Sequence, residues 1–155
     1  MKMLAPLEIG IAVRDLAAMT KFYADILGFK TVSEVNVPAD KSKANGLSPD
    51  GCTVVRLQTG YGERIKLLAA PSTGAGKRGQ WLLARAGLAY VTLIIGGIDA
   101  LCARLKAQGV ELASDAPVEN RAGLRVLFFQ DPEGNVLELV EYADLADYRP
   151  DLQPR

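Results

Sequence analysis

An internal repeat is the feature that most constrains how this 155-residue chain can fold. Residues 7–13 and residues 88–95 both carry the aliphatic pattern of a strand. Each is followed by a segment with helical spacing of apolar residues, 16–27 in the first unit and 98–108 in the second. Such a repeat predicts two copies of one supersecondary unit, packed about a pseudo-two-fold axis.

The rest of each unit is predicted to form strands joined by turns and loops. The expected strands are residues 29–35, 52–59 and 64–69 in the first unit, and 110–112, 124–130 and 136–142 in the second. The expected loops are 37–49 and 113–122, and DPEGN at 131–135 is a tight turn. We therefore predict one domain over 1–155, with module 1 at about 6–69, a linker at about 70–78, module 2 at about 79–142 and a C-terminal tail at about 143–155.

Composition argues against several classes of function. The 18 basic and 18 acidic residues give a net charge of zero, so no nucleic-acid partner is expected. No apolar run is long enough to span a membrane, and the N-terminus does not resemble a signal peptide. Cys52 and Cys102 lie far apart and outside any metal-ligand spacing, which favours free thiols and a cytoplasmic location.

Histidine is absent from the chain. This absence excludes a Ser-His-Asp triad and a histidine-rich zinc or iron site. It is informative because imidazole is the commonest metal ligand and the commonest base near neutral pH. Any chemistry must use carboxylates, Lys, Tyr, Cys, Arg or the backbone.

Two segments resemble the signatures of the vicinal oxygen chelate superfamily, which includes glyoxalase I, bleomycin-resistance proteins and extradiol dioxygenases. They are LEIGIAVRDLAAMTKFYADILGF at 7–29 and FFQDPEGNVLELVEY at 128–142. The resemblance implies an α+β fold in which two βαβββ modules form a mixed eight-strand curved sheet around a central cavity. It also implies a small organic ligand in that cavity and a homodimer.

Metal-dependent members of this superfamily place four ligands on the first and last strands of the modules. By position these are Glu8, Lys66, Tyr90 and Glu138, and only Glu138 has the residue type usual in the family. Lys66 cannot act as a ligand at neutral pH, because its ammonium has no lone pair. The resemblance thus implies a metal site that has been lost or rewritten, and we predict no cofactor. A divalent metal on Glu8 and Glu138 is the alternative.

Charged residues within apolar strands require partners. Three interpretations of Glu8, Lys66 and Glu138 remain open. They form a structural ion-pair cluster, or they contact or protonate a ligand as catalytic residues, or the two carboxylates bind a metal together with water.

Other residues are candidates for ligand binding. Tyr90 either donates a hydrogen bond to the ligand or packs as a core aromatic. Arg56 lies on a strand that lines the cavity in this family. Phe128 and Phe129 lie on opposite faces of one strand, and we assign the ligand-lining position to Phe129.

The leading hypothesis is binding, or metal-independent transformation, of a small organic molecule in the cavity between the modules. The alternative is a metal-dependent isomerase or epimerase, lyase or dioxygenase that uses carboxylates. The glycine-containing strand IGIAV, similar to that of methylmalonyl-CoA epimerase, favours this alternative. A plain dimerisation module is the third possibility, and whether the protein is an enzyme stays open.

Overall fold

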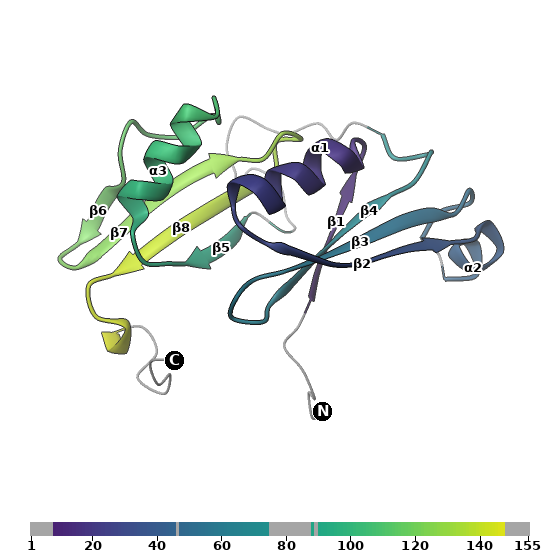
Figure 1. Cartoon of the computed structure of the whole chain (residues 1–155), viewed down its shortest axis with the longest axis horizontal. Coiled ribbons are helices and arrows are strands. Elements are labelled where there is room, and N and C mark those ends of the chain that lie inside the picture. Colours follow the sequence, from purple (N-terminus) through teal and green to yellow (C-terminus); the bar gives the residue numbers. More distant parts are fainter. Residues whose placement is uncertain (1–7, 46, 75–87, 89, 148–155) are drawn as a thin grey trace. The chain divides into compact units, whose positions relative to one another are not determined.

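The computed structural model describes residues 8–45, 47–74, 88 and 90–147 (Figure 1). Tertiary contacts divide the chain into two compact units, residues 1–78 and 79–155, and each unit is a βαβββ module. The predicted linker beyond residue 74 and the predicted tail beyond residue 147 lie outside the described residues.

Module 1 is a four-stranded mixed sheet with one main helix. In spatial order its strands are β1 (Glu8–Val13), β4 (Arg64–Ala69), β3 (Cys52–Gln58) and β2 (Lys30–Val37). β1 runs parallel to β4, and the other neighbours are antiparallel. The helix α1 (Leu16–Lys21) continues as a π-helical turn, η1 (Phe22–Ile26), and a second helix, α2, spans Ala39–Ala44.

The ends of α1 and η1 follow from local sequence. Asp15 accepts a hydrogen bond from the Ala18 backbone N–H at 2.9 Å and so caps α1. Gly28 has a φ of +80°, a left-handed conformation that ends helices and favours glycine.

One face of the module 1 sheet forms the core with α1, which contacts β4. The buried side chains on this face include Ile11, Val13, Leu57, Ile65 and Leu67, and Met19, Phe22 and Tyr23 are buried on the helical segment. Because side chains alternate along a strand, the residues between these apolar positions lie on the opposite face, here called the open face of module 1.

The prediction of a loop over residues 37–49 was wrong in part. α2 occupies this segment, and β2 extends to Val37, which pairs with Cys52. Pro38 stands at the N-cap, where its missing N–H costs nothing, and the Ala and Lys residues that follow favour helix.

Module 2 repeats the arrangement. In spatial order its strands are β5 (Val91–Ile94), β8 (Val136–Tyr142), β7 (Leu124–Gln130) and β6 (Val118–Arg121). The helix α3 (Ile98–Ala107) has the predicted position and buries Ile98, Cys102 and Leu105, and a 3-10 turn, η3, spans Leu145–Asp147.

Two predictions in module 2 were wrong. The expected polar loop at 113–122 contains β6, and the expected strand at 110–112 makes only an isolated bridge from Leu112 to Phe129. All four residues of β6 are exposed at the sheet edge, so the strand lacks the apolar alternation by which strands are recognised.

Strand register confirms the internal repeat. In module 1 Gly10 pairs with Lys66, and in module 2 Thr92 pairs with Glu138. The sequence shift that matches Val13 to Ile95 also matches Gly10 to Thr92, so Lys66 and Glu138 hold equivalent places on their sheets. The predicted α+β fold of two βαβββ modules is confirmed, with the strands paired as two four-stranded sheets. None of the described helices has the length and apolar character needed to cross a membrane.

Candidate functional site

Four charged side chains gather on the open face of module 1. Glu8 on β1 pairs in register with Arg64 on β4, and Lys66 on β4 pairs with Arg56 on β3. Arg64 and Lys66 are two residues apart, so alternation places all four on one face. We call these four residues the Glu8 cluster.

The Glu8 carboxylate is the centre of this cluster. Its Oε2 lies 3.4 Å from Lys66 Nζ and 3.7 Å from Arg56 Nε, and its Oε1 lies 3.5 Å from Arg64 Nη1. The Glu8 side chain is 25% exposed, and the three cations are 31% to 42% exposed. The cluster is therefore half-buried and still within reach of solvent or a ligand.

Neighbouring polar residues hold two of these cations in place. Arg56 Nη1 donates to Ser33 Oγ on β2 at 3.3 Å, and Arg64 Nε donates to Gln58 Oε1 on β3 at 2.7 Å. Both partners are register neighbours of the arginine that they bind. Each guanidinium group is thus held by Glu8 and by a polar side chain of a neighbouring strand.

The charge state of Glu8 follows from these contacts. Partial desolvation raises the pKa of its carboxyl. The hydrogen bond and charge of Lys66, the hydrogen bond of Arg64 and the charge of Arg56 together lower this pKa by a larger amount. The net result is a pKa below the ordinary value of 4.5. Glu8 is therefore ionised at neutral pH.

This arrangement does not fit a divalent metal on Glu8. The Oε2 oxygen already faces two protein cations, and a bound metal would be repelled by both. Among the residues that the structure describes, no three His, Cys, Asp or Glu side chains come together in a way that could hold a metal ion.

Module 2 carries a different set on the equivalent face of its own sheet. Thr92 Oγ1 donates to Glu138 Oε2 at 2.7 Å, and the rings of Tyr90 and Phe128 meet edge to face with centroids 5.3 Å apart. Tyr90 is 38% exposed. Glu138 thus has a neutral partner where Lys66, its equivalent in module 1, has an anionic one.

The structure distinguishes the two phenylalanines that alternation alone leaves equivalent. Phe129 is 1% exposed and lies on the same face of β7 as buried Leu127, whereas Phe128 is half-buried on the other face, beside Tyr90. Phe129 is therefore a core side chain of module 2. Phe128 lies on the more accessible face of β7, whereas Phe129, for which we predicted a ligand-lining position, is buried.

Arg64 is the cluster residue that the sequence analysis missed. The signal was present, because Arg64 stands two positions before Lys66 and so shares its face. A strand start is often exposed, and this made Arg64 resemble an ordinary solvated residue.

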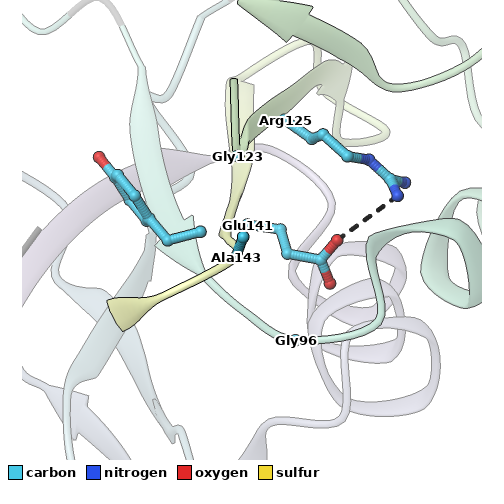
Figure 2. Close-up of a pocket in the computed structure, with 6 residues that line it drawn as sticks. Gly96, Gly123, Arg125, Glu141 and Ala143 are labelled. Atoms are coloured by element: carbon cyan, nitrogen blue, oxygen red, sulfur yellow. Dashed lines mark ion pairs between the residues drawn. The ribbon is translucent and has the colours of Figure 1, made fainter. Parts of the chain in front are cut away.

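A second group of charges lies beside an open hollow of about 370 Å³ in module 2 (Figure 2). The hollow is lined by Gly96, Gly123, Arg125, Glu141, Tyr142 and Ala143. Arg125 Nη1 lies 3.7 Å from Glu141 Oε2, and its Nη2 lies 2.5 Å from Asp99 Oδ1. Glu141 Oε1 accepts from the backbone N–H groups of Gly97 and Ile98, at 2.5 and 3.1 Å. These charges therefore bind each other and the start of α3.

Sequence comparison decides the family. The model of the Glyoxalase/Bleomycin resistance protein/Dioxygenase superfamily matches residues 5–139. The chain belongs to this superfamily. It is also 30% identical over 134 residues to the uncharacterized protein YaeR of Escherichia coli (strain K12), covering 86% of this chain and 93% of that protein.

Solved structures of superfamily members have the same fold. A glyoxalase family protein from Bacillus cereus is 24% identical, with a TM-score of 0.79 over 92% of this chain and 97% of that one. A glyoxalase family protein from Enterococcus faecalis is 23% identical, with a TM-score of 0.65 over 90% and 98% of the two chains. A mutant of glyoxalase I from Zea mays is 20% identical, with a TM-score of 0.64, and the match covers 90% of this chain and 46% of that one.

Proposed function

We propose that this superfamily member binds a small organic molecule at the Glu8 cluster, and does so without a metal. The observation that carries the proposal is the pair of cations, Lys66 and Arg56, on one oxygen of Glu8. By resemblance, Glu8 and Lys66 occupy positions from which metal-dependent relatives ligate their metal. Here a protein cation fills the place of the metal charge.

The chemistry available at this place is hydrogen bonding and charge, with Glu8 as an ionised acceptor. Lys66 offers a compact ammonium with three donors, and each arginine offers a planar fork of five. Such groups orient a ligand's polarised oxygens and stabilise negative charge that develops on them. Sequestration needs only this binding, and a metal-independent transformation would use the same donors.

Ligand screening in the presence of a chelator tests the proposal. Thermal melts of the purified protein would be recorded with a panel of aromatic antibiotics, acyl thioesters and small organic acids, each with and without EDTA. We expect at least one compound to raise Tm equally in both conditions, because bound ligand stabilises the folded state. The variants Arg56→Gln and Lys66→Gln should lose this rise, and Lys43→Gln, an exposed lysine of α2, should keep it.

Two results would contradict the proposal. One is stabilisation that EDTA abolishes and Zn²⁺ or Mn²⁺ restores, which would favour the metal-dependent isomerase, lyase or dioxygenase alternative. The other is the absence of any stabilising compound across the panel.

A further inference from the structure

The Glu8 cluster has an unbalanced charge. Three cations, Arg56, Arg64 and Lys66, surround one carboxylate, which leaves a local charge of plus two. Lys30 on β2 is the register partner of Gln58 on β3, and it adds a further basic residue on the same face of the sheet. The imbalance is local, because the whole chain has a net charge of zero.

Strand register places like charges against each other in this cluster. Arg56 and Lys66 are directly opposite on neighbouring antiparallel strands, a pairing that destabilises a sheet when the charges are alike. The shared Glu8 oxygen offsets part of this repulsion, but one carboxylate cannot offset three cations. An additional anion at this place would relieve the remaining repulsion.

Hydrogen-bond donors remain for such an anion. In the part of the chain that the structure describes, Arg56 makes one hydrogen bond, from Nη1 to Ser33, and its Nη2 has no partner. Lys66 Nζ faces Glu8 alone among the described residues, although an ammonium has three donors. Both side chains are about one-third exposed, at 33% and 31%.

The residue beside Lys66 on the neighbouring strand is a glycine. Gly10 on β1 is the register partner of Lys66 and has no side chain to lie over it. A Cβ at Gly10 would come within 3.1 Å of Leu68 Cδ1, so the Leu68 side chain would have to shift slightly to admit one. On the side of the edge strand β1, Lys66 therefore has a glycine as its register partner, and its side chain is 31% exposed.

We infer that the ligand of this site is a small oxyanion, a carboxylate, phosphate or phosphonate, that accepts hydrogen bonds from Arg56 and Lys66. This inference rests on the proposed function and adds the chemical class of the ligand. A planar guanidinium and an adjacent ammonium match the oxygens of such a group. Glu8 acts as a positioning residue, because its one oxygen holds both cations on the same side.

Calorimetric titration at constant ionic strength tests the inference, with oxalate, inorganic phosphate and methylphosphonate as probes. Oxamide, a neutral analogue of oxalate, is the control ligand. We expect at least one oxyanion to bind, oxamide not to bind, and Lys66→Gln and Arg56→Gln each to weaken binding by about tenfold or more. Lys66→Arg, which keeps the charge, should retain most of the affinity, and Lys43→Gln should bind as the wild type does.

The possible outcomes separate the two proposals. Equal affinity of wild type and folded Lys66→Gln for an oxyanion would overturn the inference, since the anion would then bind elsewhere. A wild-type protein that binds uncharged organic compounds through the cluster but no oxyanion would also overturn it, while the proposed function would stand. If neither class binds, both proposals fail. Circular dichroism of each variant establishes that lost binding is not lost folding.

Discussion

At the residue scale, we expect Glu8 to contribute more to the stability of this protein than any one of the cations around it. Its carboxylate contacts Arg56, Arg64 and Lys66, whereas each cation contacts no other described carboxylate. Removing Glu8 therefore leaves three adjacent like charges, and removing one cation reduces the repulsion between the others. The two kinds of substitution should have unequal effects on stability.

We expect Glu8→Gln to lower the free energy of unfolding by about 1 kcal/mol at low salt, because the pairs are partly exposed and each contributes modestly. Lys66→Met should change it by less than about 0.5 kcal/mol. Denaturant melts at low and high salt measure this, and the Glu8→Gln effect should shrink as salt screens the repulsion. A larger loss from Lys66→Met than from Glu8→Gln would contradict this description of the cluster.

Glu8 should also contribute to acid sensitivity. Its folded pKa lies below the ordinary value of 4.5, so its stabilisation is present above that pH and is lost as the pH falls through the lowered folded pKa. We expect the wild type to lose more stability than Glu8→Gln when melts at pH 7 and about pH 3 are compared. Parallel losses in the two proteins would show that Glu8 has no lowered pKa.

At the element scale, the two modules start their main helices by different means. Asp15 caps α1 from the adjacent position, whereas the N-cap residue of α3 is Gly97, which has no side chain to cap the helix. Glu141 on β8 supplies the missing acceptor to the N–H groups of Gly97 and Ile98, and Arg125 lies beside it. In module 2 a strand residue therefore caps the main helix, whereas in module 1 the residue that precedes the helix caps it.

Glu141→Ala should destabilise the protein by about 1 kcal/mol, as loss of an N-cap usually does. Glu111→Ala, at an exposed glutamate of the same module, is the matched control and should be near neutral. Urea melts of both variants test the assignment. Equal stabilities would mean that the carboxylate does not cap α3.

The difference between these caps also explains what the sequence could predict. The contact of Asp15 with α1 is local and can be recognised from the sequence. The contact of Glu141 with α3 spans more than forty residues and requires the β5–β8 pairing. β6 was missed because a short polar edge strand has no apolar period. A charged partner for Glu8 was expected from the sequence, because a charged residue in an apolar strand requires one. Only the register established which arginines are its partners.

At the scale of the whole molecule, we propose that the chain forms a homodimer, as its superfamily resemblance implies. The edge strand β2 supports this, because it exposes the apolar side chains of Val32 and Val35, at 43% and 44%. Edge strands with exposed apolar residues are prone to pair with another chain. Light scattering should give twice the chain mass of 16.6 kDa. A single-chain mass at micromolar concentration would contradict the proposal.

We propose that protein cations stand at the positions where, by resemblance, metal-dependent members of the superfamily hold their metal, and measurement of the metal content tests this proposal. The untagged protein would be produced with Zn, Fe, Ni and Mn supplied, purified without chelator, and examined by elemental analysis. The contacts of Lys66 and Arg56 with Glu8 predict far less than one metal per chain. About one transition metal per chain, lost together with ligand binding on dialysis against a chelator, would contradict the claim.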